Sequence, residues 1–315
     1  MTPLVDRSLR LIVNGKAAGN QALRAAVGTI RGQGVRLEVR VTWEGGDAAQ
    51  YAAEAVQDDV DIVIAAGGDG TINEIVNGIM NVTDSPNVAV GVVPFGTAND
   101  FATGCGIPTG NPLTALSLAA GGEPRLIDVG RVNDRHFINV ASGGIGARVT
   151  AETPAGMKKV LGGGAYSLMG LVTAAKMEPY RGKLVTPEGE EHGAMILMAV
   201  GNGRLAGGGY DVAPKALLDD GLLDAMAVLD VDVREFGVVL SELMNVGGEQ
   251  NRYVVYRQMA SFRIEAEEPL HMNLDGEPVL DTSYEFDILP RRLPFILPDT
   301  APLVVEPAST NPGNL

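Results

Sequence analysis

Residues 61–80 have the sequence DIVIAAGGDGTINEIVNGIM, in which a β-branched run is followed by a glycine-rich turn and then by a helical pattern. The run Asp61 to Ala66 predicts a buried strand, and Ile72 to Met80 predicts a helix. A glycine-rich turn between strand and helix lets backbone N–H groups approach a phosphate closely, and the helix dipole adds a favourable potential. The stretch therefore predicts a strand-turn-helix unit with a phosphate site at its bend.

The same residues also fit an ordinary helix start. Thr71 and Glu74 have the spacing of a capping box, and glycines alone require only a turn. This interpretation leaves Asp69 unexplained, because a carboxylate repels a phosphate unless Mg²⁺ or ordered water lies between them. No GxxxxGK[ST] sequence occurs, and Asn73 replaces the third glycine of GxGxxG, so neither a P-loop nor a dinucleotide fingerprint is present. We favour the phosphate site.

Outward from this stretch, the first 120 residues alternate strand-like runs with helical stretches. The predicted strands are Leu9 to Val13, Val35 to Val41, Asp61 to Ala66 and Val88 to Val93. The predicted helices are Gln21 to Ile30, Ala48 to Gln57, Ile72 to Met80 and Pro112 to Ala120. This alternation is typical of an α/β domain with a largely parallel sheet.

After Arg125 the pattern becomes mainly strand-like, interrupted by one helix predicted at Val233 to Asn245. We expect an α/β N-terminal domain at 1–133 and a mainly β, β-sandwich-like domain at 134–290, and the tail 291–315 can return to the first domain. The predicted strands are Leu126 to Val132, Phe137 to Val140, Met195 to Val200, Leu223 to Leu229, Tyr253 to Tyr256, Ser261 to Ala266 and Tyr284 to Leu289.

Composition excludes several functional classes. The net charge of -15 argues against nucleic-acid binding and predicts repulsion from anionic lipid headgroups. The single Cys105 and three histidines show no zinc spacing, and no GxSxG nucleophile motif occurs. No apolar run reaches the roughly 20 residues of a membrane span, and no secretory signal is evident. We expect a cytoplasmic protein that contacts a membrane only peripherally and transiently.

Two further segments carry polar groups suited to chemistry. Pro94 to Ala102 follows a predicted strand, so its polar groups emerge at the carboxyl edge of the sheet, and an ordinary crossover loop is the alternative. Thr42 likewise ends a strand, before a helix that Asp47 is placed to cap. In Asp275-Gly276-Glu277, two carboxylates two residues apart point to one side of an extended segment. The alternative is an Asp-Gly hairpin turn with solvated charges.

These blocks together resemble the diacylglycerol kinase catalytic-domain family, which includes sphingosine kinases, and they match its YegS-like bacterial lipid kinases best. The resemblance implies an NAD kinase/phosphofructokinase-like first domain and spans nearly the whole chain, although Asn14-Gly15 replaces an Asn-Pro common among relatives. The motifs are Asn14-Gly15-Lys16, Val41-Thr42-Trp43-Glu44, GGDGTIN at 67–73, GTANDFA at 96–102, Gly201-Asn202-Gly203-Arg204 and Leu274-Asp275-Gly276-Glu277.

The resemblance implies a role for each block. It implies that ATP is bound by Gly67, Gly68, Asp69, Gly70, Thr71, Ile72 and Asn73, with the phosphates on the GGDGT part, and that Thr42 and Thr97 also contact ATP. Glu277 is implied as the acceptor of the hydroxyl proton, with Asp275 and Asp69 as supporting catalytic acids. A Mg²⁺ loop is implied at Leu217, Asp220 and Leu222, with oxygen ligands suited to a hard cation. A tight Asp-Gly turn is the alternative there.

The sequence thus predicts a Mg²⁺-dependent kinase that transfers phosphate from ATP to a lipid hydroxyl at a membrane surface. The lipid is left open among phosphatidylglycerol-, diacylglycerol- and sphingoid-like molecules, and homo-oligomerisation is left open as well. Met157 to Met177 joins Lys158-Lys159 to apolar residues and fits either a lipid cleft or core. The alternatives for the whole chain are a soluble-metabolite kinase of the NAD kinase type and a nucleotide-binding sensor without turnover.

Overall fold

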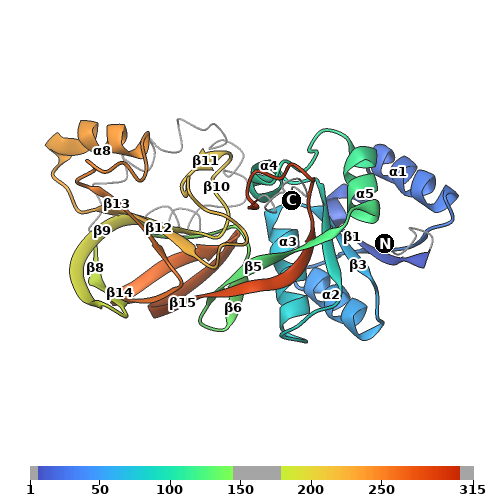
Figure 1. Cartoon of the computed structure of the whole chain (residues 1–315), viewed down its shortest axis with the longest axis horizontal. Helices are drawn as coiled ribbons and strands as arrows, with labels where there is room; N and C mark the ends of the chain where they lie inside the picture. The colour runs from blue at the N-terminus through green and yellow to red at the C-terminus, as the bar shows by residue number, and fades with distance from the viewer. Residues whose placement is uncertain (1–5, 145–178, 306–315) are drawn as a thin grey trace, which may run out of the picture.

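The computed structural model describes residues 6–144 and 179–305. Its first half contains four parallel strands in the order β4-β3-β1-β2, and helices cover both faces of this sheet (Figure 1). The α/β architecture predicted for this half is confirmed. The strands are β1 (Ser8–Val13), β2 (Arg36–Val41), β3 (Ile62–Gly67) and β4 (Ala89–Pro94).

The helices form two layers. Helices α1 and α5 share a buried core with one face of the sheet, and α2 and α3 share a second core with the other face. All six residues of β3 are therefore buried, as expected for a parallel strand covered on both sides. The helices are α1 (Gln21–Gly32), α2 (Asp47–Gln57), α3 (Asp69–Met80), α4 (Asp100–Gly104) and α5 (Pro112–Gly121), and a 3₁₀ turn spans Gly15–Ala17.

The second half is built mainly of strands, as predicted, and they pair mostly antiparallel. The predicted helix at 233–245 is shorter than expected, because a 3₁₀ turn at Val233–Glu235 precedes α8 (Phe236–Leu243). The strands are β5 (Pro124–Val132), β6 (Arg135–Phe137), β7 (Val140–Gly144), β8 (Tyr180–Thr186), β9 (Gly189–Gly201), β10 (Leu205–Ala206), β11 (Tyr210–Asp211), β12 (Leu223–Leu229), β13 (Val254–Met259), β14 (Ser261–Leu274) and β15 (Glu277–Ile296).

The long strands β5 and β15 join the two halves into one sheet (Figure 1). β15 pairs antiparallel with β14 and β5, and its Phe295 pairs parallel with Val90 of β4. Leu293, Phe295 and Leu297 are buried in the core that also contains α2 and α3. The domain boundaries at residues 133 and 290 stay a prediction, because backbone pairing crosses both.

The strand predicted at Phe137 to Val140 is wrong. β6 ends at Phe137 and β7 begins at Val140. The two residues between them donate their N–H groups to the Asp275 carboxylate, Ile138 at 2.8 Å and Asn139 at 3.1 Å. These donors are thus turned to a side chain instead of a neighbouring strand, which interrupts the ladder.

Close packing of α2 against α3 predicts a large effect of one methyl group. A Cβ on Gly78 of α3 would overlap the carbonyl oxygen of Ala49 in α2, whereas a Cβ on Gly28 of α1 meets nothing within 4 Å. We expect Gly78→Ala to destabilise the protein by about 1–3 kcal/mol, because backbone must shift. Gly28→Ala should instead stabilise it by about 0.5–1 kcal/mol. Urea unfolding of both variants tests this, and a neutral Gly78→Ala would contradict it.

Candidate functional site

Two loops meet at the carboxyl edge of the parallel sheet. β3 ends at Gly67 and α3 begins at Asp69, and the N-cap residue Gly68 makes no side-chain capping bond. A Cβ on Gly68 would lie 2.8 Å from the Cα of Gly96 in the loop after β4, so the two loops touch backbone to backbone. The first N–H groups of α3 are left without a side-chain cap, which is the arrangement that binds anions at helix ends.

The predicted phosphate segment divides into an accessible part and a buried part. Gly68, Asp69 and Gly70 are half-buried, whereas the side chains of Thr71, Ile72 and Asn73 are buried. The Thr71 hydroxyl accepts a hydrogen bond from the Asn14 amide at 3.2 Å, and its side chain fills the space beside Gly67. Backbone N–H groups at 68–70 are therefore the accessible donors of this segment.

The predicted capping box is wrong. α3 begins at Asp69, two residues before Thr71, and Thr71 lies within the helix. The Glu74 carboxylate accepts the N–H of Gly46 at 3.0 Å, in the loop before α2. Burial raises the pKa of Glu74. Glu74 thus ties a neighbouring loop to α3 and does not cap its own helix.

Thr42 lies beside the turn that follows β1. Its hydroxyl accepts the N–H of Gly15 at 3.2 Å, and a Cβ on Gly15 would lie 2.6 Å from the Thr42 carbonyl oxygen. The glycine that departs from the family's usual proline is thus matched to this close contact. Asp47 does not cap α2 as predicted: its carboxylate accepts the N–H groups of Trp43 and Glu44 in the preceding loop.

Thr97 is exposed in the loop after β4. Asn99 holds this loop: it has a positive φ of 53°, and its Oδ1 accepts the N–H of Gly96 at 2.7 Å. Because Gly96 touches Gly68, this loop borders the N-terminus of α3. The exposed Thr97 side chain therefore lies in a loop next to the proposed phosphate site.

Asp69 connects the two loops. Its carboxylate accepts the N–H of Asp100 at 3.2 Å and that of Phe101 at 3.1 Å, at the start of α4. A carboxylate is a favourable cap for a helix N-terminus. These bonds account for the acidic residue between glycines without a metal, and the Mg²⁺-linked and catalytic roles of Asp69 stay predictions.

Asp100 ties the loop after β4 to the strand-rich half, a contact that the sequence-based prediction missed. It is buried, and burial raises the pKa of its carboxyl group. Its carboxylate accepts the N–H groups of Gly208 at 3.0 Å and Gly209 at 2.7 Å, which lie in the β10–β11 hairpin of the strand-rich half. A signal was present, because Asp100 lies inside GTANDFA and residues 207–209 are three successive glycines.

Asp275 and Gly276 form the two-residue turn between β14 and β15. Leu274 pairs with Glu277, and the turn residues have φ values of 49° and 107°. The predicted extended segment is therefore wrong, and the Asp-Gly hairpin turn is right for the backbone. The charge is not solvated, however, because Asp275 is only 7% exposed.

The Asp275 carboxylate accepts four hydrogen bonds. Three come from the backbone of Ile138 (2.8 Å), Asn139 (3.1 Å) and Val140 (2.9 Å), and the fourth comes from the Asn73 amide of α3 (3.2 Å). Burial raises the pKa of Asp275 to about 6, while these bonds favour the ionised form. The side chain is an anchor between the halves and has little surface left for a ligand.

Glu277 remains accessible at the same place. It is exposed, and its Oε1 lies 3.9 Å from the position that a Cβ would take on Gly70. The structure thus brings Glu277, from the strand-rich half, to the first turn of α3. Asp275 and Glu277 both face α3, at Asn73 and Gly70 respectively.

The predicted Mg²⁺ residues lie in a loop of acidic side chains. Asp220 accepts the N–H of Leu222 at 3.0 Å, and burial together with the neighbouring Asp219 raises its pKa. Asp128, whose pKa burial also raises, accepts the N–H of Gly221 at 2.7 Å. In residues 6–144 and 179–305, no three His, Cys, Asp or Glu side chains form a metal cluster. The Mg²⁺ site predicted here has only one such side chain, Asp220, and its other two ligands are the main-chain carbonyl oxygens of Leu217 and Leu222. That site stays a prediction.

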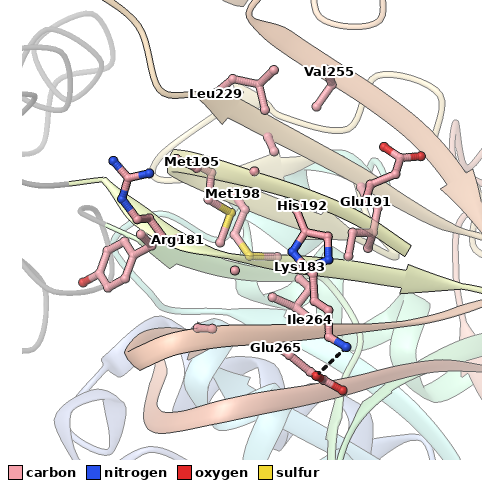
Figure 2. Close-up of a pocket in the computed structure, with 18 of the residues that line it drawn as sticks. Arg181, Lys183, Glu191, His192, Met195, Met198, Leu229, Val255, Ile264 and Glu265 are labelled. Atoms are coloured by element: carbon pink, nitrogen blue, oxygen red, sulfur yellow. Dashed lines mark ion pairs between the residues drawn. The ribbon is translucent and has the colours of Figure 1, made fainter. Parts of the chain in front are cut away.

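A cavity of about 450 Å³ lies within the strand-rich half, between β8, β9, β12, β13 and β14. Figure 2 shows Met195 and Met198 in its middle and the Lys183–Glu265 ion pair (3.1 Å) to one side. None of the predicted site residues lines it. The proposed lipid segment Met157 to Met177 lies outside the described residues.

Comparisons with known proteins match most of the chain. Residues 8–132 match the diacylglycerol kinase catalytic domain, and residues 139–297 match the YegS C-terminal NAD kinase beta sandwich-like domain. A "probable lipid kinase YegS-like" of Chromohalobacter salexigens is 45% identical over 95% of this chain and 96% of its own. One from Stenotrophomonas maltophilia is 42% identical over 94% and 97%. A crystal structure of a diacylglycerol kinase from Bacillus anthracis has a TM-score of 0.78 at 28% identity, covering 93% of this chain and 97% of its own.

The contrast between Asp275 and Glu277 gives a stability prediction. Asp275→Ala leaves three buried N–H groups without an acceptor and should lower the free energy of unfolding by at least about 3 kcal/mol. Glu277→Ala removes an exposed side chain and should change it by no more than about 0.5 kcal/mol. Chemical denaturation measures both, and equal losses would show that Asp275 is not the anchor described.

Proposed function

Because the chain belongs to the YegS-like branch of the diacylglycerol kinase catalytic-domain family, we propose that it transfers the γ-phosphate of ATP to a hydroxyl group of a lipid. The observation that carries the proposal is the exposed Glu277 carboxylate beside Gly70, where α3 presents uncapped N–H groups. We propose that Glu277 is the proton acceptor and that this end of α3 is the anion site.

The proposed reaction follows from this pairing. The lipid oxygen attacks the γ-phosphorus, the bond to the bridging oxygen of ADP breaks, and the hydroxyl proton passes to Glu277. A hydroxyl is a poor nucleophile, so a positioned carboxylate accelerates the step by roughly 10²–10⁴-fold. Phosphoryl transfer otherwise depends on positioning and charge neutralisation. Backbone N–H groups at 68–70 and the Thr42 and Thr97 hydroxyls are the groups that we propose to hold ATP.

The acidic loop supports Mg²⁺ as a further component. Asp220 lies near Asp219 and Asp128, and the negative charges of these carboxylates repel one another. A bound cation relieves repulsion of this kind. We propose that Asp220 and the carbonyl oxygens of Leu217 and Leu222 hold the ion. A bound ion would supply positive charge that offsets these neighbouring carboxylates.

The interior of the strand-rich half favours a lipid over a soluble metabolite. The cavity is lined mainly by apolar side chains, including Met198, Phe262 and Ile264, and its volume lies in the range of ligand pockets, about 300–1,000 Å³. A soluble-metabolite kinase of the NAD kinase type has no use for such a lining. A sensor without turnover, in turn, does not require a carboxylate such as Glu277 beside the phosphate site.

We propose that the cavity receives the apolar chain of the lipid. Met198 lies two residues from Val200, which pairs with Ala141, and Ala141 pairs with Leu274 next to the Asp275 turn. The path from Met198 to the turn covers two residues along β9 and then two strand spacings, across β7 to β14. The cavity wall is therefore roughly 12 Å from that turn. This separation suits a lipid whose hydroxyl lies at Glu277 and whose chain extends away from it.

Contact with a membrane is proposed as peripheral and transient, from the cytoplasmic side. No helix in the described part of the chain is long and apolar enough to span a bilayer. The net charge of -15 opposes strong binding to anionic lipid, so an exchange of single lipid molecules is favoured over firm attachment.

Transfer of labelled phosphate from ATP tests the function. The assay contains Mg²⁺ and mixed micelles of phosphatidylglycerol, diacylglycerol or a sphingoid base, with NAD and fructose 6-phosphate as soluble controls. We expect label only in lipid, and a loss of roughly 10²–10⁴-fold for Glu277→Gln with ATP binding intact. Label only in a soluble control would identify a metabolite kinase, and ATP binding without transfer would identify a sensor.

The cavity gives a prediction about chain length. Met195→Asp places a charge in the apolar lining, so the KM for long-chain lipids should rise at least about tenfold while short-chain analogues are unaffected. Met244→Asp is the matched control, because Met244 is 81% exposed on the surface after α8. Thermal unfolding of both variants checks that they fold. An equal effect on short and long chains would exclude the cavity as the chain site.

A further inference from the structure

Trp43 is the only tryptophan of the chain, and its side chain is 95% exposed. It follows Thr42 directly after the carboxyl end of β2. Burying an indole contributes more than burying almost any other side chain, so one left in water at the edge of a site calls for a ligand or partner. No role in the site described above uses it.

The exposure of Trp43 does not come from a loosely held loop. The Trp43 N–H donates to the Asp47 carboxylate at 2.6 Å, and the Glu44 N–H donates to it at 3.0 Å. The N–H of Gly46 donates to Glu74 of α3 at 3.0 Å. The loop is therefore tied both to α2 and to the helix whose N-terminus forms the proposed phosphate site.

The strand order sets the distance between Trp43 and that site. The parallel strands run β4-β3-β1-β2, so their carboxyl ends lie along one edge. β2 is two strands from β3, which is about 10 Å. Between them lies the turn after β1, where Gly15 has no side chain and touches the Thr42 carbonyl. If a nucleotide had its phosphates at Gly68 to Gly70 and its sugar over Gly15, its base would reach Thr42 and Trp43.

The side chains near Trp43 also favour the purine base of a nucleotide as its ligand. A purine presents a flat, neutral π-face, and an aromatic side chain is its best complement. In the part of the chain that the structure describes, the aromatic residues of the neighbouring loop do not offer a free face: Phe101 is 1% exposed and Phe95 packs against the core. A bilayer is a poorer match, because Glu44 and Asp47 flank Trp43 and the chain is acidic throughout.

We propose that Trp43 is the stacking surface for the purine ring of the nucleotide and so contributes to nucleotide affinity. The proposal rests on the proposed function, since it takes ATP as the ligand of the phosphate site. Its role is binding: the reacting γ-phosphate lies at the far end of the molecule, and Trp43 does not contact it.

The single tryptophan makes the test direct. ATP titrated into the unmodified protein should quench or shift the tryptophan emission, and inorganic tripolyphosphate, which has no base, should leave it unchanged. Trp43→Ala should raise the KM for ATP roughly 5- to 100-fold with kcat unchanged, and Trp43→Phe should restore most of the affinity. Leu126→Ala, another exposed apolar residue (52%), is the matched control and should change neither.

Equilibrium dialysis with labelled ATP distinguishes a failure of the stacking proposal from a failure of the proposed function. If ATP binds but the emission does not respond and Trp43→Ala keeps its KM, the stacking role is overturned and the proposed kinase stands. If the emission responds to phosphatidylglycerol vesicles and not to ATP, Trp43 is a membrane contact and the stacking role is again overturned. If no ATP binds by dialysis, the proposed function fails and the inference fails with it.

Discussion

The site depends on one buried carboxylate, that of Asp275. It accepts N–H groups from Ile138, Asn139 and Val140 and the amide of Asn73, and so joins two segments of the strand-rich half to α3. Leaving any of these donors unpaired in a buried place is costly, so the turn has one stable position. Glu277 follows two residues later, and its place beside Gly70 is a consequence of that anchor.

Other carboxylates around the site also accept backbone N–H groups from distant segments. Asp69 binds the backbone at the start of α4, Asp100 binds Gly208 and Gly209, and Asp128 binds the N–H groups of Gly221 and Arg291. Each of these carboxylates accepts backbone donors from a segment remote in sequence, and glycines let several of those segments come close. Apart from Arg291 of β15, the segments held in this way lie in loops or at the start of a helix, outside the sheet ladder. The acidic composition has a structural use that net charge alone does not reveal.

Features of the structure that arise from neighbouring residues could be predicted from the sequence, whereas features that arise from contacts between distant residues could not. The apolar runs of β1, β3 and β4 predicted their strands to within about one residue, because burial on both faces is a local pattern. The break at Ile138 and Asn139 was not predictable, because its cause, Asp275, is more than 130 residues away. Glu74 fitted a capping box by spacing, yet Gly46 of a neighbouring loop is its partner. The family resemblance pointed to Glu277, whose role stays a prediction, but gave no sign that Asp275 is buried.

The continuous sheet also limits how the site can open. β15 begins at Glu277, continues beside β5, and reaches Val90 of β4 through Phe295. β4 leads into the loop that carries Gly96 and Thr97. A hinge motion that separated the halves would have to break this pairing and expose Leu293 and Phe295, which are fully buried. Glu277, the proposed proton acceptor, and the loops proposed to bind the nucleotide therefore border one continuous sheet.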